Sequence, residues 1–208
     1  MFGLSEKEEK ILRNLSTPQK IQDFLDRLPM NHEKQGDTYM SPRRVLRERK
    51  AHCIEAALVA ATALWIQGKK PLLLDLTSRE DDDDHVVALF QQNGYWGAIS
   101  KTNHIVLRYR DPIYRTIREL ALSYYHEYFL NKNGEKTLVS YSRPLDLTRF
   151  GTGWIIEEAD LWSIADALDS SRHYPLVPKV NERFIRRATV TERKGGEIVE
   201  WYIDDPRT

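Results

Sequence analysis

Residues 49–64 read RKAHCIEAALVAATAL, and this stretch decides the fold. From Ile54 onward it is apolar apart from Glu55 and Thr62. A helix that is apolar around most of its circumference is a buried one, so the stretch predicts a central helix. Cys53, the single cysteine of the chain, stands at the N-terminal end of this helix. Unpaired N–H groups and the helix dipole favour a thiolate there, which makes Cys53 a candidate nucleophile.

The composition is that of a soluble globular protein rather than a disordered one, with 41% apolar and 30% charged residues. Lys plus Arg and Asp plus Glu number 31 each, so no overall field indicates a nucleic-acid partner or an acidic membrane surface. One cysteine excludes an internal disulfide framework and a cysteine-based zinc site. We therefore expect no metal and no cofactor.

The N-terminal residues MFGLSEKEEK lack the basic and apolar regions of a signal peptide. The longest apolar run, around Cys53, is too short to span a membrane and contains Glu55. These features predict a cytoplasmic protein without a membrane partner.

Helices are predicted first along the chain, from cap residues and apolar stripes. They cover 5–15, 17–28, a short basic helix from Ser41-Pro42, and the central helix to Gly68. Strands are then predicted at 71–76, 85–91, 95–100 and 105–109, with Asn93-Gly94 as a hairpin turn. The remaining predictions are a helix from Asp111-Pro112 to about Tyr128, a short strand at 138–141, a helix at 157–168, and a hairpin of 184–191 with 197–203.

Helices followed by an antiparallel meander predict an α+β fold, with the Cys53 helix packed on the sheet. At 208 residues the chain is expected to form a single domain, 1–208. Its core covers about 41–130, and a C-terminal extension of a helix and a hairpin covers about 137–208. That hairpin is a possible surface for a homo-oligomer.

Cys53 and His85 form the first candidate catalytic pair. His85 opens a predicted strand 32 residues after the cysteine. Acyl transfer needs a thiol that ionises near neutrality and an imidazole that takes and returns its proton. A third polar group should hold the imidazole in one tautomer. Ser100 and Asn103, at the end of the returning hairpin strand, are placed to do so.

The segments AHCIEAALVAATAL, DHVVALF and YWGAIS, in this order, resemble the transglutaminase-like superfamily of papain-like cysteine enzymes, and the whole chain looks like its small bacterial members. The resemblance covers about 41–109. It implies that Cys53 is the nucleophile and His85 the base. The family pattern ends the third segment in Asp, where this chain has Ser100. A serine hydroxyl can accept a hydrogen bond from the imidazole but carries no charge. Asn103 could orient the ring instead, as the asparagine of papain-like proteases does.

Two functions follow from this pattern. The first is cysteine-dependent acyl transfer on a peptide or other amide-containing substrate, by hydrolysis or transamidation. The second is a non-catalytic member of the fold used as a binding module, which the Ser100 departure favours.

Four further features of the sequence allow a structural as well as a functional interpretation. His52 adjoins Cys53, but neighbouring helix residues do not face each other, so a locally hydrogen-bonded histidine is expected. The acidic run 80–84 is expected to be a solvated turn rather than a calcium site, although Asp84 beside His85 favours an imidazolium. The basic helix of 43–50 is expected to be solvated or salt-bridged. Gln35 and Tyr39 are candidate oxyanion donors.

Overall fold

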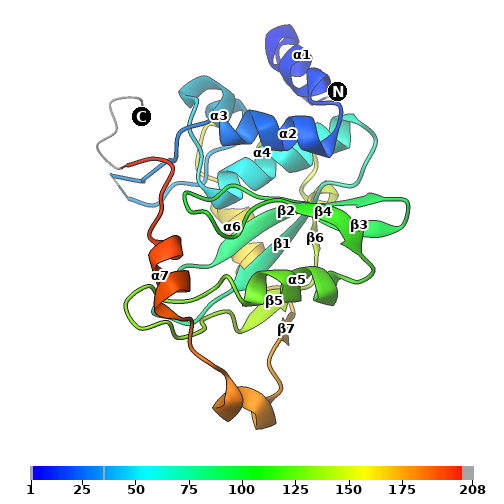
Figure 1. Ribbon diagram of the computed structural model, residues 1–208. Coiled ribbons are helices and arrows are strands. Elements are labelled where there is room, and N and C mark those ends of the chain that lie inside the picture. The colour runs from blue at the N-terminus through cyan, green and yellow to red at the C-terminus, as the bar shows by residue number, and fades with distance from the viewer. Residues whose placement is uncertain (1, 35, 203–208) are drawn as a thin grey trace.

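The computed structural model describes residues 2–34 and 36–202. Within them the chain forms one twisted antiparallel sheet with helices on both faces (Figure 1). The predicted α+β class, with the Cys53 helix packed on an antiparallel sheet, is confirmed.

Four helices precede the sheet. They are α1 (Glu6–Asn14), α2 (Pro18–Asp26), α3 (Pro42–Glu48) and α4 (Cys53–Ile66). Ser5, Thr17 and Ser41 each accept a backbone N–H of the first turn, as the cap signals predicted. Helix α4 is buried from Ile54 to Leu64, between the first three helices and the sheet.

The sheet has the order β4-β3-β2-β1-β5-β7, and β6 also pairs with β1. Its strands are β1 (Leu72–Thr77), β2 (His85–Gln92), β3 (Tyr95–Ile99), β4 (Arg110–Tyr114), β5 (Ser140–Ser142), β6 (Leu145–Asp146) and β7 (His173–Pro175). Asn93 and Gly94 both have positive φ, as the predicted hairpin turn requires. Strands from the predicted extension thus join the same sheet as the predicted core.

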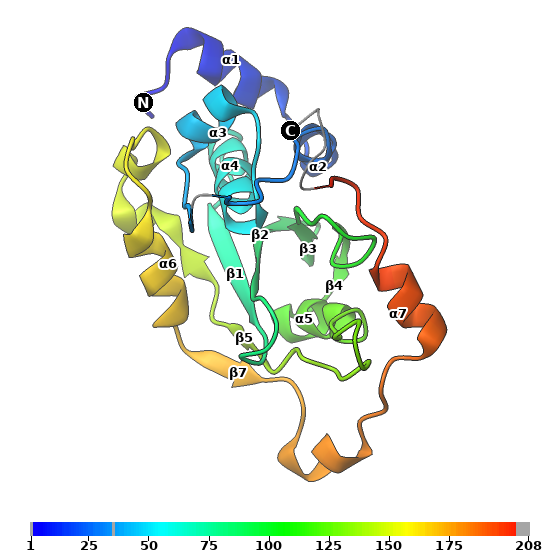
Figure 2. The ribbon, with the colours of Figure 1, turned by 90° about the vertical axis from the view of Figure 1, so that its left-hand side faces the viewer.

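The sheet separates two apolar cores. One lies beneath α1–α4 and α6 (Trp162–Asp169), and the other lies beneath α5 (Ile117–Tyr125) (Figure 2). Short 3₁₀ turns at Leu147–Phe150, Gly153–Ile155 and Lys179–Phe184 connect the later elements. Because β2 and β3 are antiparallel, the start of β2 and the end of β3 lie side by side. This places His85 next to Ser100.

The prediction for 105–128 was wrong in its boundaries. Residues 105–109 form no strand; the strand is β4, which contains Asp111 and Pro112. Pro112 is tolerated because β4 is an edge strand. The helix starts later, at Ile117, because Thr116 and not Asp111 caps it by accepting the N–H of Glu119.

The predicted C-terminal hairpin was also wrong within the described residues. Residues Val190–Gly196 form helix α7, which begins at a capping box of Thr189 and Glu192. Gly195-Gly196 ends this helix instead of turning a hairpin. Ile203, the last residue of the predicted second strand, lies outside the described residues. The predicted helix 157–168 is α6, which begins five residues later.

Candidate active site

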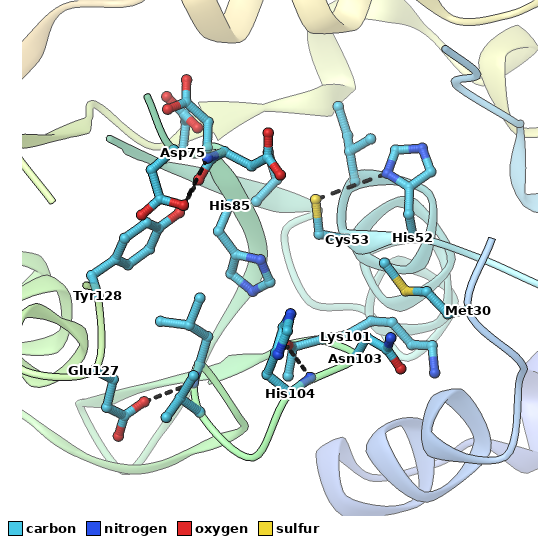
Figure 3. Close-up of a pocket in the computed structure, with 18 of the residues that line it drawn as sticks. Met30, His52, Cys53, Asp75, His85, Lys101, Asn103, His104, Glu127 and Tyr128 are labelled. Carbon is cyan, nitrogen blue, oxygen red and sulfur yellow. Dashed lines mark hydrogen bonds between the residues drawn. The ribbon is translucent and has the colours of Figure 1, made fainter. Parts of the chain in front are cut away.

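A pocket of about 640 Å³ opens between the N-terminal end of α4, the start of β2 and the segment that follows β3. Figure 3 shows Cys53 and His52 on its α4 side and the imidazole of His85 across from the thiol. Both members of the predicted pair therefore line one cavity.

Cys53 is the first residue of α4 and is half-buried. Its position depends on the extended segment before it. Ala51 exchanges backbone hydrogen bonds with the loop, donating to the carbonyl of Pro29 and accepting from the N–H of Asn31. The N–H groups of the first turn of a helix have no acceptor within the helix, so the backbone N–H of Cys53 is available to a ligand.

His85 is 5% exposed, and its ring orientation is fixed by Ser100. Nε2 lies 2.7 Å from the Ser100 Oγ, and that hydroxyl donates its single hydrogen to the carbonyl of Leu107. Toward the ring, Ser100 can therefore only accept, so Nε2 carries the hydrogen. A neutral His85 is then left with a free lone pair on Nδ1, which suits a proton acceptor.

Ser100 is itself held from behind by a buried amide. The Gln22 side chain of α2 donates to the Ser100 carbonyl at 2.7 Å and accepts its N–H at 3.0 Å. Through these two bonds the Gln22 side chain pairs with the backbone of Ser100, the first residue after β3. Nothing in the sequence pattern around Gln22 indicated this role.

Asn103 is used elsewhere. Its side-chain amide donates to the carbonyl of Trp201 and accepts the N–H of the same residue, both at 2.8 Å. Its own carbonyl accepts the N–H of Glu200. The residue lines the pocket and ties the C-terminal segment to it, while Ser100 is the residue that contacts the His85 ring.

His52 contacts the Cys53 thiol, a contact that was not predicted from the sequence. Its Nδ1 lies 3.9 Å from the Cys53 Sγ. Neighbouring residues inside a helix do not face each other, but His52 is the extended N-cap that precedes the helix. Its Nε2 lies 2.7 Å from the carbonyl of Thr38 and 3.5 Å from a carboxylate oxygen of both Glu33 and Glu55.

Glu55 is the anionic centre of a buried network beneath His52. It is 0% exposed and accepts hydrogen bonds from the side chains of Asn31 and Thr38 and from the backbone N–H groups of Met40 and His52. Burial acts to raise the pKa of Glu55, but the bond with His52 and the backbone bonds hold it below its ordinary value. A charged carboxylate therefore lies in the first turn of α4, two residues after Cys53.

These contacts favour a thiolate. Burial acts to raise the pKa of the Cys53 thiol, but hydrogen bonding with His52 and then with His85 brings it down to about 5. Burial acts to lower the pKa of His52, but its bonds to Cys53 and Glu55 raise it to about 11. The pocket thus stabilises an ion pair at the head of α4.

The lining of the pocket is acidic although the whole chain is neutral. It contains eight carboxylate residues and one lysine, Lys101. The carboxylates belong to Glu33, Asp37, Asp75, Asp82, Asp83, Asp84, Glu127 and Asp169. Within the described residues no group of three or more His, Cys, Asp or Glu side chains is arranged to hold a metal ion.

The other sequence features have structural roles. In the acidic loop, Asp84 accepts the backbone N–H and the hydroxyl of Ser78. In the basic helix, Arg43 pairs with Glu8 and Arg44 with Asp160. These bonds make the loop a structured turn and the basic helix a salt-bridged face.

The two oxyanion candidates have different outcomes. Tyr39 lies in the pocket lining, where its ring packs at 4.6 Å from that of Trp162. Gln35 lies outside the described residues.

No protein-family model matches the chain. No curated protein matches it. Among solved structures, calcium-bound LapG of Legionella pneumophila is similar, with 14% identity and a TM-score of 0.36, over 45% of this chain and 59% of that chain. The match therefore spans less than two thirds of the LapG chain. No helix among residues 2–34 and 36–202 has the length and apolar character needed to cross a bilayer.

Proposed function

We propose that the pocket is the active site of a cysteine-dependent enzyme that transfers the acyl group of an amide to water or to an amine. The observation that carries the proposal is the His85 ring. Its Nε2 is held 2.7 Å from Ser100, which leaves Nδ1 free in the pocket that contains the Cys53 thiol. The amide is that of a peptide or of an amide-bearing side chain.

In the first half-reaction the Cys53 sulfur forms a bond to the amide carbonyl carbon. The C–N bond breaks, and the nitrogen leaves as an amine after taking from His85 the proton that the thiol had released. The backbone N–H of Cys53 is placed to bind the oxyanion, because it is not used within the helix. The product is an acyl thioester on Cys53.

In the second half-reaction a water or an amine attacks the thioester carbon. His85 accepts its proton, the C–S bond breaks, and the thiolate returns. Ser100 keeps the imidazole in one orientation through both steps. Water gives a carboxylate and completes hydrolysis, whereas an amine gives a new amide and completes transamidation.

A non-catalytic binding module is the second candidate. It is favoured by the neutral Ser100 hydroxyl, which gives an imidazolium on His85 less support than a carboxylate gives. In that case the pocket would hold a peptide without cleaving it.

Acylation of Cys53 separates the two candidates. We expect p-nitrophenyl acetate to release one equivalent of p-nitrophenolate in a burst, with the acetyl group found on Cys53 by mass spectrometry. His85→Asn should slow deacylation by a factor on the order of 100. His126→Asn, which changes an exposed histidine at the end of α5, is the matched control.

A peptide pool incubated in heavy-oxygen water, with and without an added amine, then identifies the reaction. Hydrolysis places one heavy oxygen in a product carboxylate, and transamidation adds the mass of the amine. Binding of peptides without either mass change, together with an unchanged deacylation rate in His85→Asn, would establish the binding module.

A further inference from the structure

The contact between His52 and Cys53 has no part in the two half-reactions above. Nδ1 of His52 lies 3.9 Å from the Cys53 Sγ atom, and the whole His52 residue is 7% exposed. His85 approaches the same thiol from the sheet side of the pocket (Figure 3). The nucleophile is therefore flanked by two imidazoles from different elements.

The two imidazoles have opposite surroundings. His85 bonds to a neutral hydroxyl, whereas His52 lies 3.5 Å from carboxylate oxygens of both Glu33 and Glu55. Nε2 of His52 must carry a hydrogen, because its partner at 2.7 Å is the carbonyl of Thr38, which can only accept. Two carboxylates favour a second proton on Nδ1, the atom that faces the sulfur.

We infer that His52 is a fixed imidazolium that stabilises the charge of the Cys53 thiolate, while His85 takes the thiol proton on Nδ1 and later delivers it to the leaving amine. His52 keeps both hydrogens throughout the reaction, since Glu55 and Glu33 balance its charge. The role of His85 in this inference rests on the proposed function. The pairing of His52 with the thiolate stands on the resting geometry alone.

The inference also removes a difficulty with Ser100. The family pattern uses a carboxylate behind the catalytic imidazole to stabilise its charged form. Here the buried carboxylate, Glu55, lies behind the other imidazole. The imidazolium that a carboxylate supports therefore lies on the α4 side of the thiol.

Several titratable groups face this pair and contribute to its pH dependence. They are Glu33 and Tyr39 from the loop before α3, Glu55 of α4, His85 of β2 and Tyr128 after α5. The carboxylates favour the imidazolium and oppose the thiolate. The two histidines favour the thiolate.

The test measures the ionisation of Cys53 without any substrate. We would follow thiolate absorbance and the rate of iodoacetamide alkylation from about pH 4 to about pH 10 in wild type, His52→Gln, His85→Asn and the control His126→Asn. We expect His52→Gln to move the midpoint upward by at least about one pH unit, which is a tenfold loss of thiolate below the midpoint. A folded His52→Gln protein with the wild-type midpoint would overturn the inference.

A second measurement uses the unaltered chain, so that the inference stays testable if His52→Gln does not fold. Nitrogen-15 shifts of the His52 ring should show both nitrogens protonated at neutral pH, and a neutral tautomer would overturn the inference. Failure of the proposed function gives a different result. The chain would then form the His52 pair but neither acylate from an ester nor process a peptide.

Discussion

Ser100 presents its Oγ 2.7 Å from Nε2 of His85. The hydroxyl also donates to the carbonyl of Leu107. One neutral side chain thereby fixes the tautomer of the histidine and anchors the loop that follows β3. The consequences differ for two substitutions at this position.

Ser100→Ala removes the acceptor and the donor together. The buried Nε2–H of His85 and the Leu107 carbonyl lose their partner, which costs about 1–3 kcal/mol of unfolding free energy for each group. The ring also loses its orientation, so we expect acylation of Cys53 by p-nitrophenyl acetate to slow by roughly tenfold or more. Ser171→Ala is the control, because Ser171 also donates to a backbone carbonyl, that of Ala167 in α6, and does not line the pocket. Equal rates in the two variants would show that Ser100 does not orient the base.

Ser100→Asp should destabilise the protein. An ionised carboxylate cannot donate to the Leu107 carbonyl and would face its oxygen in a site that is 2% exposed. We expect a loss of about 2–3 kcal/mol in urea unfolding at neutral pH. The pKa of the new carboxyl would be raised in the folded state, so the loss should shrink as the pH falls toward the ordinary value of about 3.9. A variant as stable as wild type at neutral pH would contradict this reasoning.

Asn103→Ala tests the other residue that was predicted to orient His85. Because both side-chain atoms of Asn103 bond to the backbone of Trp201, the substitution should release the C-terminal segment. We expect faster hydrogen exchange at Glu200 and Trp201 and an unchanged pH midpoint for Cys53 alkylation. A raised midpoint without faster exchange would instead assign Asn103 to the imidazole.

The sequence predicted the central helix and the order of the site residues because these depend on local signals. The apolar run after Cys53 can only be buried, and the Asn93-Gly94 turn brings the end of β3 back beside the start of β2. His85 and Ser100 then have to be neighbours. No carboxylate was needed to predict their contact.

Other features depend on contacts between distant segments or on backbone geometry. His52 reaches the thiol because the chain is extended at the N-cap, which a helical-wheel argument cannot represent. Gln22 meets Ser100 across 78 residues of sequence. Helix α7 was the avoidable error, since Thr189 and Glu192 have the spacing of a capping box.

Lys101 predicts an alkaline rise in stability. The residue is 2% exposed, and its ammonium donates to the carbonyl of Leu28, two residues beyond the end of α2, 2.6 Å away. Burial lowers the pKa of Lys101 to about 8, although Glu200 and Asp26 oppose the shift. The unfolded chain then binds more protons than the folded one between about pH 8 and about pH 10.5, so this group adds stability as the pH rises through that range.

Lys101→Met isolates that contribution. Each unit of pKa shift corresponds to about 1.4 kcal/mol, so wild type should gain on the order of 3 kcal/mol relative to Lys101→Met between neutral pH and about pH 10.5. Urea unfolding of both proteins across this range measures the difference. A constant difference between the two proteins would show that Lys101 is not destabilised by burial. Lys70→Met, at an exposed lysine, should follow the wild-type curve.

The acidic lining predicts that Cys53 discriminates between reagents by charge. Eight carboxylates and one lysine line the pocket that contains the thiol, and a pocket lined mainly by one sign of charge concentrates ions of the opposite sign. A trimethylammonium-ethyl methanethiosulfonate should therefore react faster than its sulfonate counterpart, by roughly tenfold at low ionic strength and less at about 1 M salt. Asp37→Asn with Asp83→Asn should reduce the preference, since both residues are exposed in the lining. Asp111→Asn, on the edge strand β4, should not. Equal rates for the two reagents at low salt would show that the field of the His52 imidazolium offsets that of the lining.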